Sequence, residues 1–331
     1  MKNILLRLYE HQTLDRNEAK EVLVNMSEGR YNDCMIASLL SVYLMRSITI
    51  EELSGFRDAL LEMCVRIDLS DFNPLDIVGT GGDNKNTFNI STLSCLVVAG
   101  AGYYVAKHGN YGATSVSGAS NVLEQYGVKF NNQEDLLKKS LEKSHFCFMH
   151  APLFSPAMKA VAPVRKALGV RTFFNLLGPL INPSFPKYQV LGVYNLKMAR
   201  LYNYMYQNLK DIQYSIIYSL DGYDEISLTS GFKWISNREE VLMKPEDLGF
   251  PVHFQRDLEA GKTPAEAAVI FDKVLHRTAT AAQMNTVVAN SAIAINTLCP
   301  EKSLSDCLGE AHDALYGGKA LQIFKTYLDL N

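Results

Sequence analysis

The stretch LDIVGTGGDNKNTFNIST, residues 75–92, is the part of the sequence that most clearly indicates the fold class. It begins with a short apolar run that is typical of a buried strand and continues through three glycines. It ends at Asn89-Ile90-Ser91-Thr92, which leads into an apolar segment that we expect to be a helix from about Thr92 to Ala101. A strand, a glycine turn and a helix form the first half of a βαβ unit. A parallel sheet is therefore predicted to begin near residue 75.

The same alternation continues along the chain. Apolar runs at 103–108, 188–194 and 214–220 are predicted strands, and the amphipathic segments 119–126 and 198–209 are predicted helices. Gly127 directly follows the first of these helices and is a suitable C-terminal stop. Strands that alternate with helices indicate an α/β domain with a mostly parallel central sheet flanked by helices. Further helices are expected within 264–298 and from Ser303 onward.

The first 70 residues have a different character. They show helical periodicity without a strand pattern, and Asp15 with Glu18 and Thr49 with Glu52 have the spacing of capping boxes. Residues 34–46 are apolar on nearly every side, which favours either a core helix or a helix that contacts another subunit. We therefore expect a small helical domain at 1–70, joined by part of the helical, proline-flanked segment 156–183. The α/β domain is expected to span 71–331.

Composition narrows the class of protein. The chain has 331 residues, is 47% hydrophobic and 20% charged, and carries a formal net charge of −3, which argues against a disordered chain and against a nucleic-acid-coating surface. The N-terminus meets charged residues too early for a signal peptide, and no apolar run is long enough to cross a membrane. The six cysteines are scattered without a CxxC pair, as expected for free thiols in the cytoplasm.

Three polar segments each follow a predicted strand. They are GTGGD (79–83), KHGN (107–110) and DGYDEIS (221–227). Since ligands of open α/β sheets bind beyond the carboxyl ends of the strands, we expect these segments to share one crevice. Each also has a simpler interpretation, as a tight turn, a solvated lysine loop and a solvated acidic turn.

Their chemistry nevertheless favours a phosphate ligand. Backbone N–H groups in a glycine turn bind anions, and an ammonium such as that of Lys107 attracts phosphate. Asp224 with Glu225 is suited to Mg²⁺, which proteins hold through one or two carboxylates together with substrate phosphates. The residues Asn89 to Thr92 either cap a helix or present its N-terminus to a phosphate. Arg165 offers a guanidinium that matches a carboxylate.

In this order and spacing, the segments resemble the anthranilate phosphoribosyltransferase family. The match comprises GTGGD, TFNIST (87–92), KHGN, VSG with VLE (116–118 and 122–124), APVRKALGVRTFFNLLGPLINP (162–183) and DGYDEIS. The resemblance implies a homodimer formed through the helical domain, and a pentosyltransferase that joins anthranilate to phosphoribosyl pyrophosphate (PRPP) in tryptophan biosynthesis with Mg²⁺ as cofactor. It implies neither a nucleic-acid nor a membrane partner.

The resemblance also implies roles for individual residues. The positions matched to PRPP binding are Gly79, Gly82, Asp83, Thr87, Asn89, Ile90, Ser91, Thr92, Lys107, Ser115 and Ala119. Those matched to anthranilate binding are Gly79, His108, Asn110 and Arg165, and those matched to Mg²⁺ binding are Ser91, Asp224 and Glu225.

The sequence departs from the common family pattern at four positions. Tyr111 replaces an arginine, Ala119 a serine, Asn121 an aspartate and Ser155 a histidine. Ser117 or Ser120 is expected to supply the hydroxyl that is missing at Ala119. Two other functions compete with the transferase: a pyrimidine-nucleoside phosphorylase of the same superfamily, and a catalytically silent relative that binds nucleic acid. The retained Lys107, Asn110, Arg165 and carboxylate pair favour an active transferase.

Overall fold

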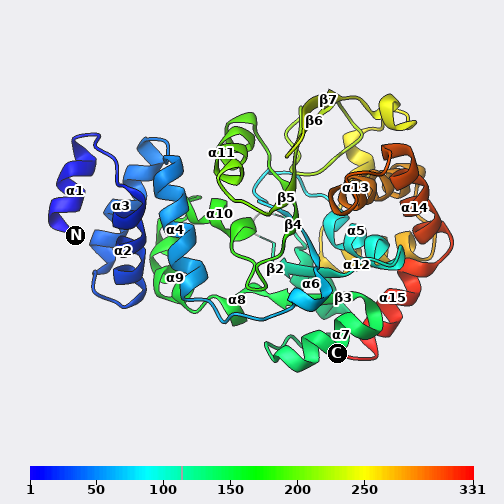
Figure 1. Ribbon diagram of the computed structural model, residues 1–331, viewed down its shortest axis with the longest axis horizontal. Helices are drawn as coiled ribbons and strands as arrows, with labels where there is room; N and C mark the ends of the chain where they lie inside the picture. The colour runs from blue at the N-terminus through cyan, green and yellow to red at the C-terminus, as the bar shows by residue number, and fades with distance from the viewer. Residues whose placement is uncertain (113–114) are drawn as a thin grey trace. The chain divides into compact units, whose positions relative to one another are not determined.

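The computed structural model describes residues 1–112 and 115–331, and the chain divides into two compact units. One combines residues 1–67 with 151–185, and the other combines 68–150 with 186–331. The first unit is helical, and in Figure 1 its later segments α9 and α10 lie beside the blue N-terminal helices. Its elements are α1 (Lys2–Tyr9), α2 (Arg16–Ser27), α3 (Asp33–Met45), α4 (Ile50–Glu62), α8 (Ala151–Phe154), α9 (Ala157–Leu168), α10 (Phe174–Leu177) and the 3₁₀ turn Gly178–Leu180.

Both predicted capping boxes of the helical unit are present. The Asp15 side chain accepts a hydrogen bond from the backbone N–H of Glu18 at the start of α2, and Thr49 does the same for Glu52 at the start of α4. The helix after Thr49 ends at Glu62. The backbone N–H groups of Val65 and Ile67 donate instead to carbonyls of Phe154 and Pro183, so tertiary pairing replaces the last helical turn.

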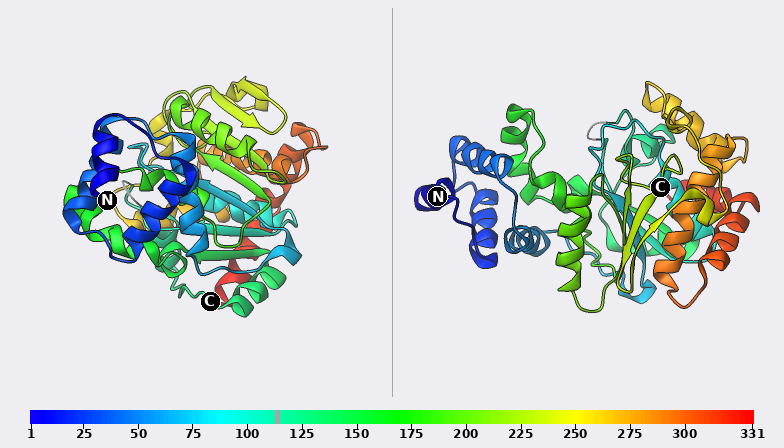
Figure 2. Two further views of the ribbon diagram at one scale, coloured as in Figure 1. Left: turned by 60° about the vertical axis from the view of Figure 1, so that its left-hand side comes forward. Right: turned by 90° about the horizontal axis from the view of Figure 1, so that it is seen from above.

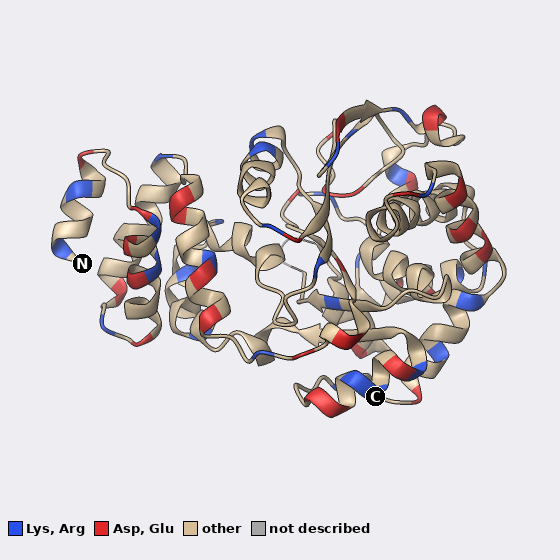
Figure 3. Cartoon of the chain, viewed as in Figure 1, with Lys and Arg blue, Asp and Glu red and all other residues tan. Residues whose placement is uncertain are grey.

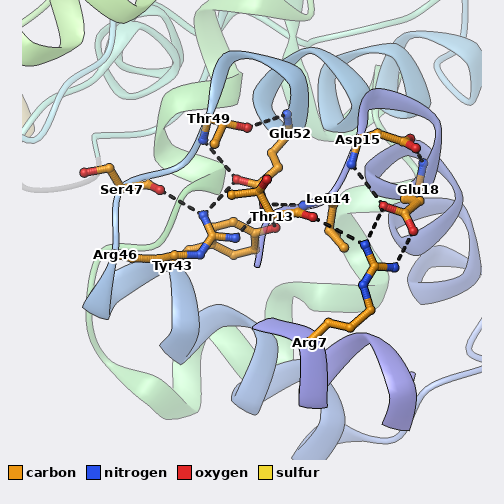
Figure 4. A network of polar contacts seen from close by, with 10 residues as sticks. All are labelled: Arg7, Thr13, Leu14, Asp15, Glu18, Tyr43, Arg46, Ser47, Thr49 and Glu52. Carbon is orange, nitrogen blue, oxygen red and sulfur yellow. Dashed lines mark hydrogen bonds and ion pairs between the residues drawn. The ribbon is translucent and has the colours of Figure 1, made fainter. Parts of the chain in front are cut away.

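The buried carboxylate of Glu52 connects three segments of the helical unit (Figure 4). Glu52 accepts hydrogen bonds from the backbone N–H groups of Leu14 (3.0 Å) and Thr49 (2.9 Å) and from the guanidinium of Arg46 (2.5 and 2.9 Å). Burial alone would raise the pKa of Glu52, but Arg46 and the backbone donors outweigh it and lower that pKa overall. The Tyr43 hydroxyl is a further donor, at 3.2 Å. One side chain therefore joins the loop before α2, the end of α3 and the start of α4.

The second unit contains a seven-stranded sheet in the order β3-β2-β1-β4-β5-β6-β7. The first five strands of this order run parallel to one another, while β6 pairs antiparallel with both β5 and β7. The strand order reverses between β1 and β4, and such a switch point is where open α/β sheets form ligand crevices. The strands are β1 (Leu75–Gly79), β2 (Val105–Gly109), β3 (Phe146–His150), β4 (Tyr188–Gly192), β5 (Gln213–Ser219), β6 (Phe232–Ser236) and β7 (Glu240–Met243).

Helices cover the sheet of this unit on both faces (Figures 1 and 2). One face carries α11 (Leu196–Gln207), and the other carries α5 (Ile90–Gly100) and α13 (Ala281–Leu298), backed by the remaining C-terminal helices. Neither α5 nor α13 contains a charged residue, so both are entirely tan in Figure 3, as expected for helices buried in a core. The other helices are α6 (Ala119–Gln125), α7 (Glu134–Ser144), α12 (Pro264–Leu275), α14 (Leu304–Tyr316) and α15 (Lys319–Leu328), with 3₁₀ turns at Ser70–Phe72, Pro245–Leu248 and Gln255–Leu258.

The predicted α/β sheet with a small helical partner is confirmed, but its edges were not predicted. The helix α7 and the strands β3, β6 and β7 were missed, and α5 begins at Ile90, two residues before the expected start. All six cysteines are free thiols. Among the residues that the structure describes, no helix is long and apolar enough to cross a membrane.

Candidate active site at the carboxyl ends of the parallel strands

The glycine turn after β1 is bent toward the end of β5. Gly81 and Gly82 both have a positive φ, of 62° and 76°, which glycine adopts without strain. The N–H of Thr80 donates to the carbonyl of Gly192 in β4 (2.9 Å), and the N–H of Gly81 donates to Oδ2 of Asp224 (2.7 Å). The predicted turn and the predicted acidic segment are thus in direct contact, although they lie far apart in the sequence.

Two glycines allow this close approach. Gly79 and Gly192 are register partners in the β1–β4 pair, and the Asp224 backbone crosses directly over Gly192. A Cβ atom on Gly192 would lie 1.6 Å from the Asp224 carbonyl oxygen, and one on Gly79 would lie 2.3 Å from Asp224 Oδ2. Gly192 was not among the predicted site residues. Its only signal in the sequence is a glycine inside an apolar strand, which often marks a close backbone approach.

The N-terminus of α5 receives the second carboxylate. The N–H of Ser91 donates to Oε1 of Glu225 at 3.0 Å, so this acidic side chain caps the helix from another segment. Neither Ser91 nor Thr92 is the N-cap, which is Asn89, and Asn89 makes no side-chain cap bond. Its amide instead donates to the carbonyl of Ser117 (3.1 Å), which joins the start of α5 to the loop before α6.

Lys107 is buried beside the same helix start, with only 2% of its surface exposed. Its Nζ donates to the Ile77 carbonyl (2.6 Å) and to Ser91 Oγ (3.3 Å). Because neighbouring residues of a strand point to opposite faces, His108 lies on the other face of β2. His108 is also buried, and its backbone N–H donates to Oδ1 of Asp76 at 3.2 Å.

Three carboxyl groups crowd this crevice and perturb one another. Burial, followed by the charge of Asp224, raises the pKa of Asp83 to about 7. Burial also raises the pKa of Asp224, and burial with the charges of Asp224 and Asp83 raises that of Glu225. Oδ2 of Asp83 is buried without a hydrogen-bond partner. A cation would relieve this excess of negative charge.

The residues present therefore fit a magnesium ion. Oxygen ligands are what Mg²⁺ prefers, and the unpartnered Asp83 oxygen marks where positive charge is lacking. Within residues 1–112 and 115–331, no group of three or more His, Cys, Asp or Glu side chains is placed so that it could hold a metal ion. Mg²⁺ typically takes one or two protein carboxylates and completes its shell with water and substrate phosphates.

Three of the four departures from the family pattern lie close together, Tyr111 in the loop after β2 and Ala119 and Asn121 in the first turn of α6. Oδ1 of Asn121 accepts hydrogen bonds from the N–H groups of Gly112 and Gly118, both at 2.9 Å, and thereby closes this loop. The Tyr111 hydroxyl donates to Glu124 (2.6 Å) on α6. Asn110 is exposed, and its side chain accepts from the N–H of Tyr111 (2.8 Å).

The expectation that Ser120 replaces the hydroxyl missing at Ala119 is wrong. Ser120 is fully buried, and its Oγ is hydrogen-bonded to Nδ1 of His150 at 2.8 Å. The Ser117 hydroxyl, at 3.3 Å, donates to Oδ1 of Asn89, which is itself a predicted PRPP-binding residue. At Ala119 only the backbone remains for a phosphate.

The remaining predicted residues are placed as follows. Ile90 and Thr92 are buried in α5, while Thr87 forms an isolated bridge with Glu259, and the Ser115 hydroxyl donates to the Ser117 carbonyl (3.3 Å). Arg165 belongs to the helical unit, where it lies on α9 with its guanidinium carbon 5.2 Å from the centre of the Phe174 ring. Burial lowers the pKa of Arg165. The structure thus groups the predicted phosphate and metal residues within the α/β unit.

Two family models match the chain and correspond to the two kinds of structure described above. Residues 72–321 match the α/β domain of a glycosyl transferase family, and residues 2–64 match the helical bundle domain of that family. The fold and the two family models therefore define a glycosyltransferase.

Similar proteins identify the family within this class. An anthranilate phosphoribosyltransferase of Bacteroides fragilis is 57% identical over 331 residues, all of both chains, and one of Cytophaga hutchinsonii is 52% identical over 98% of this chain and 99% of that one. The crystal structure of the Thermus thermophilus anthranilate phosphoribosyltransferase superposes with a TM-score of 0.91 at 30% identity, covering 98% of both chains. The Saccharomyces cerevisiae enzyme, in complex with PRPP and Mg, also gives 0.91, at 25% identity over 100% of this chain and 98% of that one. The chain belongs to the anthranilate phosphoribosyltransferase family.

Proposed function

We propose that this protein transfers the phosphoribosyl group of PRPP to the amine of anthranilate, giving N-(5-phosphoribosyl)anthranilate and pyrophosphate in tryptophan biosynthesis. The observation that carries this proposal is the meeting of the glycine turn, the α5 N-terminus, Lys107 and the Asp224–Glu225 pair at one end of the sheet. These are the groups that a pyrophosphate ester with a bound cation requires. The close relatives of the same family support the choice of substrates.

Each group has a defined task in binding PRPP. The N–H groups of the glycine turn and of the α5 N-terminus donate to phosphate oxygens, except those of Thr80, Gly81 and Ser91, which have acceptors within the protein. The Lys107 ammonium adds a positive charge that Ser91 and Ile77 hold in place. Asp224, Glu225 and Ser91 are the residues that would hold Mg²⁺. When bound, this ion neutralises charge that accumulates on the departing pyrophosphate.

The reaction requires little further assistance from the protein. An arylamine is largely unprotonated at neutral pH, so its nitrogen can attack the ribose without a strong base. The enzyme's contribution is to hold the amine near C1 of the ribose and to stabilise the leaving group with fixed donors. None of the residues proposed for the site forms an activated nucleophile pair, so we expect direct displacement without a ribosylated enzyme. Asn110, His108 and Arg165 are the residues proposed to bind anthranilate, with the Arg165 guanidinium matched to its carboxylate.

The loss of anthranilate fluorescence in the presence of PRPP and Mg²⁺ tests the proposal. We expect fluorescence to fall only when both are present, and to fall far more slowly for the double variant Asp224→Asn/Glu225→Gln. Circular dichroism of that variant provides the folding control. A wild-type protein that leaves anthranilate unchanged but cleaves thymidine with phosphate would instead support the nucleoside phosphorylase alternative.

We further propose a homodimer formed through the helical unit, in the cytoplasm. Large apolar side chains are exposed on two of its helices, namely Leu6 and Tyr9 on α1 and Leu44 and Met45 on α3, with Met45 88% exposed. Exposed apolar side chains of this size favour a surface that another protein covers, and a second copy of the chain is the expected cover. Light scattering should show a dimer for the wild type and a monomer for Leu44→Glu/Met45→Glu. A monomeric wild type would contradict this part of the proposal. The six free thiols agree with a reducing compartment.

A further inference from the structure

The segment that follows the carboxylate pair is held by the side chain of a distant helix. Asn290 lies on α13 and is 8% exposed. Its Oδ1 accepts the N–H of Ile226 (3.0 Å), and its Nδ2 donates to the Ile226 carbonyl (2.8 Å). One side-chain amide therefore satisfies both polar backbone groups of the residue next to Glu225.

Two further contacts hold the same stretch of backbone. The Thr286 hydroxyl, one helical turn before Asn290 on α13, donates to the Ser227 carbonyl at 3.4 Å. From the end of β5, the Ser219 hydroxyl donates to the Glu225 carbonyl at 2.6 Å. The segment is thus held both by the helix α13 and by the end of β5. Of these three side chains, Asn290 is the one that bonds both the N–H and the C=O of the same residue.

The site gives this anchoring a purpose beyond packing. Asp224 and Glu225 lie on the segment directly before Ile226, and each carboxylate reaches a backbone N–H of the crevice, of Gly81 and of Ser91. An asparagine fixes the following residue without adding charge to this acidic segment. Aspartate at this position would lose the donor to Ile226 and add a further negative charge, and leucine would leave two buried backbone groups unpaired.

We propose that Asn290 is a positioning residue for the carboxylate pair, and that its clamp on Ile226 holds Asp224 and Glu225 in place for the divalent cation. The inference rests on the proposed function of that pair in holding Mg²⁺. Asn290 touches neither substrate nor metal and acts through the backbone of Ile226. Groups that orient metal ligands in this way typically contribute 10- to 100-fold in metal affinity.

The same helix offers a matched control. Asn296 also lies on α13 and is 4% exposed, and its amide is similarly engaged at both ends, donating to the Lys302 carbonyl (3.0 Å) and accepting from Arg238 (3.1 Å). Neither partner belongs to the crevice. Asn290→Ala and Asn296→Ala remove the same atoms from the same helix. A difference in metal affinity between the two variants therefore reflects where the amide lies, and not merely the loss of a buried amide.

The test measures Mn²⁺ binding in the presence of pyrophosphate by electron paramagnetic resonance, together with hydrogen exchange of the Ile226 amide without metal. We expect Asn290→Ala to raise the Kd for Mn²⁺ at least about tenfold and to accelerate exchange at Ile226. Asn296→Ala should change neither, at similar thermal stability. Asn290→Ser, whose hydroxyl keeps one of the two partners, should lie between wild type and Asn290→Ala, and it replaces Asn290→Ala if that variant does not fold.

The outcomes separate the two proposals. Equal Mn²⁺ affinity in wild type, Asn290→Ala and Asn296→Ala would overturn the positioning role, as would equal losses in both variants. A wild-type protein that binds no Mn²⁺ with pyrophosphate would overturn the proposed metal site itself, whatever the variants show.

Discussion

Replacing Gly192 with alanine should disable the site through a single steric contact. Gly192 lies in β4 and does not have a positive φ, so an alanine there can adopt the same backbone conformation without strain. The new Cβ would lie 1.6 Å from the Asp224 carbonyl oxygen and 2.8 Å from its carbonyl carbon. Since comfortable contact between such atoms begins near 3.5 Å, the Asp224 peptide must move by roughly 2 Å.

That displacement determines the expected loss. A shift of about 1 Å in a catalytic group can cost about 10²-fold in rate, so kcat/KM should fall by at least about that factor. The cost in folding free energy should be about 1–3 kcal/mol, as for other overpacked positions. The Mg²⁺ concentration needed for half-maximal activity should rise, because the shift acts directly on the carboxylate pair.

Steady-state kinetics with varied Mg²⁺, together with urea unfolding, measure both effects. Gly309→Ala is the control, because Gly309 lies in α14 with nothing within 4 Å of its added Cβ. Alanine there should stabilise the helix by about 0.5–1 kcal/mol and leave the kinetics unchanged. If Gly192→Ala kept the wild-type kcat/KM, and a crystal structure of the variant showed Asp224 unmoved, this steric explanation would be wrong.

Further substitutions test other parts of the account. Arg165→Ala should raise the KM for anthranilate more than the KM for PRPP, and the reverse order in steady-state kinetics would contradict its assignment. Lys107→Met should raise the KM for PRPP and leave that for anthranilate nearly unchanged, whereas equal effects on both would count against a phosphate contact. Glu52→Ala should lower the free energy of unfolding by about 3–5 kcal/mol at pH 7, because it leaves the partly buried Arg46 guanidinium and the buried Leu14 N–H without their acceptor. The pKa of Glu52 is lowered in the folded state, so its stabilisation is complete above about pH 4.3 and is lost as the pH falls through the lower folded value. Urea unfolding at pH 7 and pH 3 should therefore show a smaller difference between Glu52→Ala and wild type at pH 3, and a constant difference would contradict this assignment.

Local sequence patterns predicted much of the α/β unit. GTGGD, KHGN and DGYDEIS each follow an apolar run, and parallel strands bring their carboxyl ends together, so the sequence alone predicts that these segments share one crevice. The contacts of Gly81 with Asp224 and of Ser91 with Glu225 confirm that placement. The two capping boxes could also be predicted from the sequence, because a capping box depends on residues only three positions apart.

The features that were missed depend on distant contacts. β3 is a short apolar run, and periodicity alone does not decide whether such a run is a strand or a helix. β6 and β7 are too short for their mixed apolar and polar patterns to be distinguished from a loop. The role of Gly192 arises only when the Asp224 backbone crosses it, and that of Asn290 only when α13 packs against the segment 64 residues before it. Ser120 looked available for phosphate, but β3 places His150 against its hydroxyl.

The most direct test of the account is the position of a bound metal. Crystals grown with PRPP and Mn²⁺, recorded at the manganese absorption edge, should show an anomalous peak bonded to a carboxylate oxygen of Asp224 or Glu225 and to pyrophosphate oxygens of PRPP. A pyrophosphate group bound elsewhere on the chain, or a manganese peak away from both carboxylates, would contradict the central claim that this crevice holds the leaving group.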